Sequence, residues 1–191
     1  SMIAKVDMVT GKVLQSNALE RKYFGEGACI HNGFIYQITW TERTCFVYDA
    51  KTFQLLGTRR YDREGWGLTT NGKELIMSDG SSTLYFLDPE TLLDKSSVKV
   101  TLDGREVNYL NELEYIDGEV WANIYTSEEI VRIDPATGKV TGVIDLKGIL
   151  PVSLRRRDTD VLNGIAYDPG TKSIWITGKN WPRVYKIAIE K

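Results

Sequence analysis

A repeat of about forty residues constrains the fold of this 191-residue chain more than any other feature. Turns that begin with an aspartate recur at Asp7, Asp49, Asp88 and Asp134. Successive starts lie 42, 39 and 46 residues apart. Repeats of this length are typical either of helical solenoids or of β-propeller blades. The apolar residues between the turns decide between the two.

Those apolar residues form short alternating runs, as in residues 34–40, 83–87 and 173–177, and this pattern predicts strands. Each repeat opens with a comparable phrase, followed by a hairpin turn and further strands. The phrases occupy residues 25–29, 65–69, 110–115 and 162–167. Their glycines suit inner strands that crowd around an axis. The expected fold class is therefore all-β, a β-propeller with about four strands in each blade.

The repeats predict one propeller domain over residues 1–191. Residues 3–20 supply only a third and a fourth strand, so they are interpreted as the remnant of an incomplete first blade. The last repeat supplies a first, second and third strand. The expected blades then cover about residues 21–61, 62–107, 108–150 and 151–191.

Composition excludes several classes of partner. The 24 Lys and Arg residues nearly balance 26 Asp and Glu residues, so no overall charge favours nucleic acid. No apolar stretch of about 18 residues exists, so no membrane span is expected. Arg155, Arg156 and Arg157 are followed by Asp158 and Asp160, which favours a solvated loop over a phosphate-binding patch.

The cysteines and the single histidine limit the chemistry further. Cys29 and Cys45 fall on the first and third strands of one blade, with backbones expected roughly 9.6 Å apart. A disulfide needs Cα atoms within about 7 Å, so two free thiols are predicted. With His31 alone, a histidine-rich zinc site and a histidine-dependent catalytic triad are excluded.

Several longer motifs, in order along the whole chain, resemble the plant-type glutaminyl cyclases of plants and bacteria. They lie at residues 23–27, 36–40, 64–69, 78–81, 110–123, 161–167 and 177–182. The resemblance implies a five-bladed propeller that converts an N-terminal glutamine of a peptide or protein into pyroglutamate and ammonia. It also implies export, to the periplasm or outside the cell.

The same resemblance implies roles for seven positions. Glu26, in the Phe-Gly-Glu-Gly motif, matches the proposed acid/base. Asn111 and Lys179 match polar residues around the reacting amide. The residues that match the substrate pocket are Phe24, Trp40, Trp66 and Tyr125, and the last of these stands where the family has tryptophan.

Two further departures from the family pattern are visible. Residues 26–29 read Glu-Gly-Ala-Cys where the family has Glu-Gly-Leu-Thr. The family's opening Phe-Thr-Gln-Gly-Leu strand, with its hairpin, does not occur in this chain.

The chemistry of cyclisation fits these residue types. The nucleophile and the carboxamide belong to one residue, so the enzyme mainly positions them and moves protons. A carboxylate such as Glu26 can do this without a metal or cofactor, and amide or ammonium donors can stabilise the oxyanion. Structural roles stay open for some of these residues. Propeller tryptophans are often packing residues. Asn111 and Asn163 occupy equivalent places in their repeats, which favours a structural hydrogen bond between blades for at least one of them. A non-catalytic propeller that binds peptides or protein partners is the competing hypothesis.

The ends of the repeat allow two ways of closing the ring. Residues 12–19 can pair beside residues 183–189 and give four blades. Alternatively, five-fold spacing is kept and the open edges pair with a second copy of the chain. We favour the second, because packing between blades resists contraction, and it predicts a homo-oligomer through open propeller edges.

Overall fold

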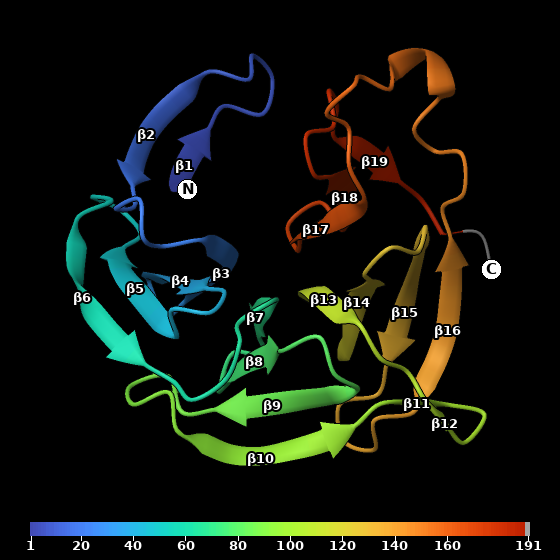
Figure 1. The fold of residues 1–191 in the computed structure, drawn as a ribbon, viewed down its shortest axis with the longest axis horizontal. Coiled ribbons are helices and arrows are strands. Elements are labelled where there is room, and N and C mark those ends of the chain that lie inside the picture. The colour runs from blue at the N-terminus through green and yellow to red at the C-terminus, as the bar shows by residue number, and fades with distance from the viewer. Residues whose placement is uncertain (190–191) are drawn as a thin grey trace.

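The computed structural model describes residues 1–189 as a set of small antiparallel sheets arranged around a ring (Figure 1). The expected all-β, propeller-like architecture is confirmed. Three of these sheets have four strands each, one has three, and β1 and β2 form a separate pair. Within the described residues, no helix is long and apolar enough to cross a membrane.

The sheets follow the chain in order. The pair consists of β1 (Met2–Val6) and β2 (Val13–Ala18). The first four-stranded sheet consists of β3 (Gly25–His31), β4 (Phe34–Thr39), β5 (Thr44–Asp49) and β6 (Leu55–Arg60). The second consists of β7 (Leu68–Thr70), β8 (Leu75–Ser78), β9 (Thr83–Leu87) and β10 (Asp94–Lys99). The third consists of β13 (Leu110–Ile116), β14 (Glu119–Ile124), β15 (Glu129–Ile133) and β16 (Val140–Asp145). The three-stranded sheet consists of β17 (Leu162–Asp168), β18 (Ser173–Gly178) and β19 (Tyr185–Ile187).

The recurring aspartates close the turn between the last two strands of each unit. Asp49 shows the pattern, because its Oδ1 accepts hydrogen bonds from the backbone N–H groups of Lys51 and Thr52 and from the Thr52 hydroxyl. These hydrogen bonds to the charged form lower the pKa of the Asp49 carboxyl. Asp7 and Asp88 make the same three-part contact. The repeat seen in the sequence is therefore a repeat of aspartate-stabilised turns.

Two details of the strands and one of the basic loop differ from what the sequence predicts. In the second unit only Leu68–Thr70 forms the inner strand, because Gly65–Gly67 leave the regular ladder to approach a neighbouring strand. A small hairpin of β11 (Thr101–Leu102) and β12 (Arg105–Glu106) lies between units. In the basic loop, Arg155 is exposed and pairs with Glu128 at 3.0 Å rather than with the aspartates that follow it.

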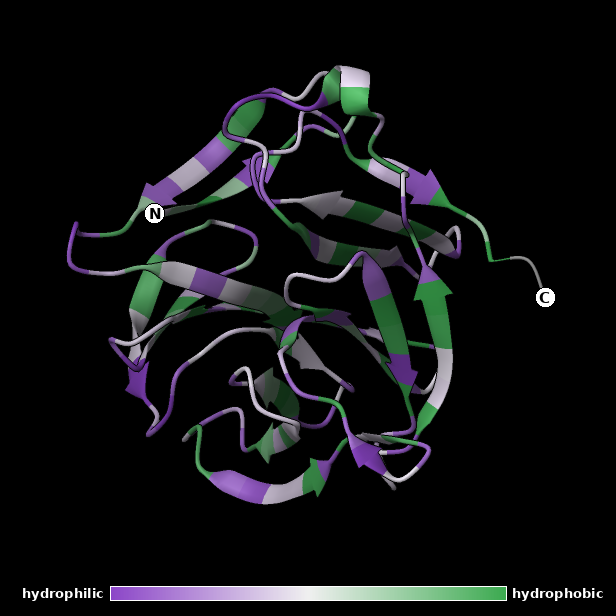
Figure 2. Cartoon of the chain, turned by 45° about the vertical axis from the view of Figure 1, so that its right-hand side comes forward, coloured by the Kyte–Doolittle hydropathy of each residue, from purple (hydrophilic) through white to green (hydrophobic). Residues whose placement is uncertain are grey.

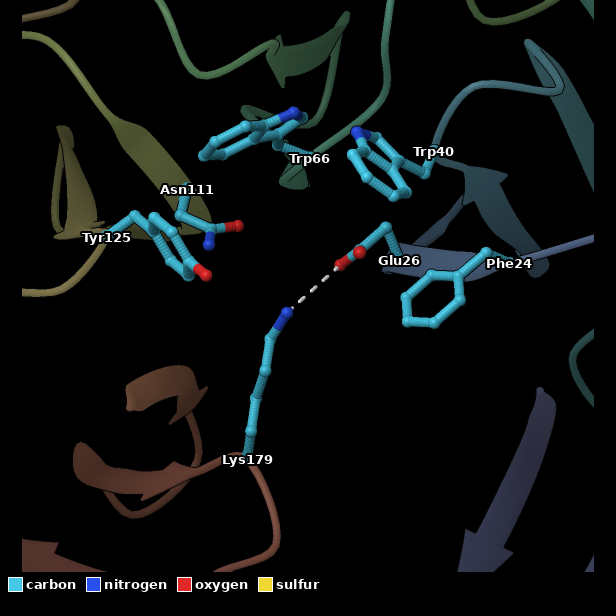
Figure 3. A pocket seen from close by; sticks show the side chains of 7 residues that line it. All are labelled: Phe24, Glu26, Trp40, Trp66, Asn111, Tyr125 and Lys179. Carbon is cyan, nitrogen blue, oxygen red and sulfur yellow. Dashed lines mark ion pairs between the residues drawn. The ribbon is translucent and has the colours of Figure 1, made fainter. Parts of the chain in front are cut away.

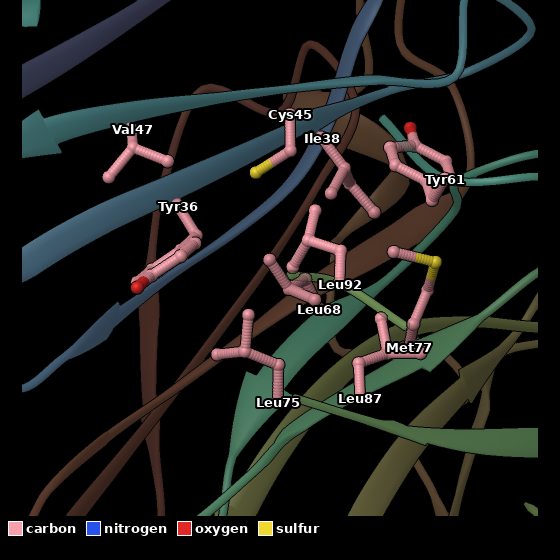
Figure 4. Packing of buried hydrophobic residues seen from close by; sticks show 10 residues of the cluster. All are labelled: Tyr36, Ile38, Cys45, Val47, Tyr61, Leu68, Leu75, Met77, Leu87 and Leu92. Carbon is pink, nitrogen blue, oxygen red and sulfur yellow. The ribbon is translucent and has the colours of Figure 1, made fainter. Parts of the chain in front are cut away.

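The hydrophobic core lies between neighbouring sheets. Figure 2 shows apolar and polar residues alternating along many strands. Between the first two four-stranded sheets, Ile38 and Cys45 pack with Leu68, Leu75 and Met77, and all five are buried (Figure 4). Each four-stranded sheet thus buries a face against its neighbour around the ring, which fixes their relative placement.

At the ends of the ring, the first pair of strands packs on the sheet that follows it. Asn17 donates a hydrogen bond to the Phe53 carbonyl at 2.6 Å, and Gln15 donates one to the Thr52 carbonyl. Among residues 1–189, β2 is paired only with β1, and β19 only with β18. The four-bladed closure, with residues 12–19 beside residues 183–189, is therefore not the arrangement found.

The two cysteines lie on β3 and β5 of one sheet, with β4 between them, as expected. Both are free. Burial raises the pKa of Cys45 to about 12 and that of Cys29 further still. Both side chains therefore stay protonated at neutral pH and pack as small apolar groups.

Two glutamates link neighbouring inner strands. Glu112 and Glu114, both on β13, accept hydrogen bonds from the backbone N–H groups of Ile165 and Tyr167 on β17, at 2.8 and 2.9 Å. Burial raises the pKa of Glu112 well above its ordinary range and that of Glu114 to about 7. The inner strands are held together by carboxyl groups where no regular strand pairing joins the sheets.

The raised pKa of Glu114 makes the stability of the fold depend on pH. A carboxyl whose pKa rises from 4.5 to about 7 on folding favours the folded state below pH 4.5, and this contribution is lost as pH rises to about 7. We expect the free energy of unfolding to fall by about 2–3 kcal/mol over this range on account of Glu114. Denaturant titrations at several pH values should show a smaller fall in the free energy of unfolding for Glu114→Gln than for the wild type. Glu90→Gln, at an exposed position, should match the wild type. Parallel curves for Glu114→Gln and the wild type would contradict this assignment.

Candidate active site

One cavity of about 210 Å³ brings together all seven residues that the sequence singled out (Figure 3). This volume is below the roughly 300–1,000 Å³ of pockets for drug-sized ligands, so the cavity suits a group of amino-acid size. Its walls are Phe24, Glu26, Trp40, Trp66, Asn111, Tyr125 and Lys179. Among residues 1–189 no group of three or more histidine, cysteine, aspartate or glutamate side chains could hold a metal ion.

Three of these residues occupy equivalent positions in three repeats, two of them on the inner strands β3 and β13 and the third just before β7. Strands β3 and β13 each shift register at a bulge, and the bulges contain Glu26 and Asn111. Trp66 takes the same place in the second repeat. A β-bulge re-aims side chains, and bulges are common beside active sites. The fourth equivalent residue, Asn163, instead accepts a hydrogen bond from the Glu112 backbone N–H, so only Asn111 of this asparagine pair faces the cavity.

A second set of equivalent positions supplies three further residues of the wall. Trp40, Tyr125 and Lys179 each follow directly after the second strand of their unit, namely β4, β14 and β18. Asp79 follows β8 in the same way, but its carboxylate accepts hydrogen bonds from Ser81 and does not line the cavity. The repeat therefore aims side chains from several units at one place.

Glu26 is the carboxylate of the cavity. Its side chain is only 15% exposed. The next residue, Gly27, packs against the backbone of Gly67 and Leu68. Burial raises the pKa of Glu26, and the ammonium of Lys179 partly offsets this. A raised pKa makes the protonated form of Glu26 easier to reach, which suits a group that accepts a proton and then returns it.

Lys179 faces Glu26 across the cavity, with its Nζ 3.9 Å from the Glu26 Oε2 (Figure 3). Its backbone is held on both sides, since it donates a hydrogen bond to the Val161 carbonyl and accepts one from the Asp160 N–H. The ammonium also lies 5.9 Å from the Tyr125 ring, within the range of a cation–π contact. The cation is thus fixed between the carboxylate and an aromatic wall.

Asn111 presents its amide to the cavity while its backbone is tightly held. The residue is buried, and its carbonyl oxygen accepts a hydrogen bond from the Ser78 hydroxyl at 2.6 Å. Its side-chain Oδ1 has no hydrogen-bond partner among the described residues. A buried acceptor without a partner costs free energy, which a ligand can recover by donating an N–H or O–H group to it.

The aromatic residues form two edge-to-face pairs around these polar groups. Phe24 and Trp40 lie with ring centroids 6.1 Å apart, and Trp66 and Tyr125 with centroids 5.6 Å apart. Such geometry is favourable for aromatic rings. The pairs provide an apolar wall for an uncharged part of a ligand.

Glu64 belongs beside this wall, although the sequence did not single it out. Its Oε2 accepts hydrogen bonds from the indole N–H groups of Trp40, at 2.7 Å, and of Trp66, at 3.1 Å. No short-range pattern links a glutamate to a tryptophan that lies 24 residues earlier. The nearby Glu-Gly-Trp spacing was the available signal, because it places a carboxylate two residues before a pocket indole.

Comparison with known proteins decides the family. The family model for glutamine cyclotransferases matches residues 1–189. This chain belongs to the glutamine cyclotransferase family. The glutaminyl-peptide cyclotransferase of Arabidopsis thaliana is 42% identical over 194 residues, which cover 100% of this chain and 61% of that protein. The chain therefore spans about three fifths of the length of this curated relative.

Solved structures agree with the family and the fold. The crystal structure of Myxococcus xanthus glutaminyl cyclase superposes with a TM-score of 0.90 at 36% identity, over 97% of this glutamine cyclotransferase chain and 80% of the other. A Bacteroides caccae protein of unknown function matches with a TM-score of 0.60 at 12% identity, over 99% of this chain and 65% of the other. The second match supports the fold alone.

The ion pair of this family member gives a direct prediction. Because the Lys179 ammonium lowers the pKa of Glu26, Lys179→Met should raise that pKa further. Carbon-13 NMR titration of the glutamate carboxyl groups measures it. Lys186→Met, which removes an exposed ammonium on β19, should leave the Glu26 pKa unchanged. An unchanged Glu26 pKa in Lys179→Met would contradict the contact across the cavity.

Proposed function

We propose that this chain carries the active site of a glutaminyl-peptide cyclotransferase, which converts the N-terminal glutamine of a peptide or protein into pyroglutamate. The observation that carries the proposal is the pairing of a shielded carboxylate, Glu26, with the Lys179 ammonium inside an aromatic-walled cavity. The named activity of the Arabidopsis and Myxococcus relatives supports it.

The first step forms the ring. The free α-amine nitrogen of glutamine attacks the carbon of its own side-chain carboxamide, so a C–N bond forms and the carbonyl oxygen takes up the displaced electron pair. Glu26, in its carboxylate form, accepts the proton that the attacking nitrogen loses. The aromatic wall of Trp40, Trp66 and Tyr125 folds the side chain back and excludes water from the reacting atoms.

The negative oxygen of this intermediate needs donors. The Lys179 ammonium and the Asn111 side-chain amide face the same cavity and can supply them (Figure 3). A well-placed donor to such an oxygen contributes about 3 kcal/mol to the transition state. The donor of Asn111 is its Nδ2 group, while its Oδ1, which has no partner among the described residues, can accept a hydrogen bond from a substrate N–H.

The second step releases ammonia. The oxygen returns its electron pair to the carbon, the bond from carbon to the original amide nitrogen breaks, and that nitrogen takes a proton from Glu26. Ammonia leaves, and the five-membered lactam remains on the peptide. Glu26 ends as the carboxylate with which it began, so the cycle needs no other proton carrier.

We further propose that the ring has the five-fold spacing of its family. The separation of β1–β2 from β17–β19 supports this spacing, because each group sits in its own sheet. The close superposition on the Myxococcus enzyme also supports it. The ring geometry matters for the site, since Glu26 and Lys179 come from different sheets and their 3.9 Å separation depends on it.

Removal of the acid/base tests the proposal. Glu26→Gln keeps the shape of the side chain but cannot carry the proton, so ammonia release from a glutaminyl dipeptide should fall by roughly 10²–10⁴-fold. The thermal unfolding midpoint should stay at or above that of the wild type, because a buried carboxyl is replaced by a neutral amide. Background-level release by the intact chain would overturn the proposal and favour a non-catalytic propeller that binds peptides or protein partners.

Trp40 should matter to turnover more than to folding. Its side chain is 42% exposed, so Trp40→Ala removes a pocket wall and leaves no sealed cavity in the core. We expect a large loss of kcat/KM with a stability loss well below the roughly 3–5 kcal/mol of a buried tryptophan deletion. A stability loss of that size would show instead that Trp40 is a packing residue.

A further inference from the structure

We propose that Glu64 is a positioning residue, which fixes the two pocket tryptophans in the orientation that binds substrate; this rests on the proposed function. One oxygen of its carboxylate, Oε2, accepts both indole N–H groups, from Trp40 at 2.7 Å and from Trp66 at 3.1 Å. Glu64 itself does not line the cavity. It can therefore act on the substrate only through the indoles or through its charge.

The two tryptophans need such a restraint to different extents. Trp66 is half-buried, and its ring packs directly against Gly80. Trp40 is exposed, with an edge-to-face contact to Phe24, which is 51% exposed itself. Packing alone therefore leaves the Trp40 ring free to turn. An indole N–H is a donor only, and a carboxylate is the stronger kind of acceptor, so the 2.7 Å bond to Glu64 is the main constraint on this ring.

The restraint joins the two aromatic pairs into one wall. Phe24 stacks edge-to-face on Trp40, Glu64 connects Trp40 to Trp66, and Trp66 stacks edge-to-face on Tyr125. A rotation of either indole would open this wall. Holding both before the substrate arrives removes an ordering cost from binding, as preorganised sites do.

Glu64 is itself anchored from both sides. The next residue, Gly65, donates a backbone hydrogen bond to the Trp40 carbonyl at 3.0 Å, and a side chain there would collide with the Thr39 carbonyl oxygen at 2.7 Å. The preceding Arg63 lies 3.6 Å over the Tyr85 ring and pairs with Asp94 at 2.6 Å. The carboxylate therefore starts from a fixed backbone, which a positioning residue requires.

The test compares three variants by NMR and kinetics. Glu64→Ala removes the acceptor, Glu64→Gln keeps an uncharged acceptor oxygen, and Glu90→Gln removes one exposed carboxylate away from both indoles and from the contacts that anchor Glu64. The five indole N–H signals of the chain are followed by nitrogen-15 NMR, together with their hydrogen exchange with solvent. KM and kcat are measured with a glutaminyl dipeptide, and its affinity by titration.

A positioning role predicts a specific combination of results. In Glu64→Ala the signals of Trp40 and Trp66 should move and exchange faster, while the other three stay in place. KM should rise by about ten-fold, as expected for the loss of a hydrogen bond to a charged group, with a smaller fall in kcat. Glu64→Gln should lie between Glu64→Ala and the wild type, and Glu90→Gln should match the wild type.

Other outcomes overturn the proposal. Unmoved indole signals in Glu64→Ala would show that the hydrogen bonds do not restrain the rings. Moved signals with unchanged KM and affinity would show that ring orientation does not matter for binding. If Glu64→Gln keeps the indole signals of the wild type yet loses as much affinity as Glu64→Ala, the charge acts rather than the positioning. Should Glu64→Ala not fold, the Glu64→Gln variant carries the same comparison. The indole readout needs no turnover, so it stands apart from a failure of the proposed activity.

Discussion

Close contact between neighbouring inner strands is the constraint on which the rest of this structure depends. A Cβ at Gly67 would lie 2.0 Å from the Asn111 carbonyl oxygen, and one at Gly27 would lie 2.6 Å from the Leu68 backbone nitrogen. No side chain fits at either place, so glycine alone permits this spacing. Glu26, Trp66 and Asn111 directly adjoin these contacts. The distance between strands therefore sets the size of the cavity and the depth at which the carboxylate lies.

Repetition explains how one site draws on the whole ring. The four units from β3 to β19 share two backbone positions, one near the start of the inner strand and one just after the second strand. Six of the eight side chains at these positions line the cavity, and Asp79 and Asn163 do not. In the mechanism that we propose, Glu26 transfers the proton and Asn111 and Lys179 stabilise the charge, while the aromatic members form the wall. The scaffold is thus general and the chemistry lies in the substitutions, as in other folds that carry many functions. On β13, two half-buried carboxyl groups, Glu112 and Glu114, hold the next inner strand, and their desolvation costs free energy.

The fold class and the cavity residues were predictable from the sequence, because the signals for both lie in short segments of the chain. Strand alternation and aspartate-led turns are local signals, so the repeat correctly predicted an all-β, propeller-like arrangement of small sheets and the free thiols of Cys29 and Cys45. The seven cavity residues were named through motifs of a family rather than through spacing alone. What the sequence could not show depends on contacts across the ring. The bond from Glu64 to Trp40, the inter-strand role of Asn163 and the short second inner strand all follow from how sheets meet, which no local pattern records.

In the function that we propose, this cavity holds the side chain of an N-terminal glutamine between the aromatic wall and the polar groups. A crystal structure of the Glu26→Gln variant with a glutaminyl dipeptide tests it most directly. We expect the glutamine side chain to lie between Trp40 and Trp66, with its carboxamide within hydrogen-bond distance of the Asn111 amide or the Lys179 ammonium. A dipeptide bound elsewhere on the protein, with the cavity empty, would contradict it.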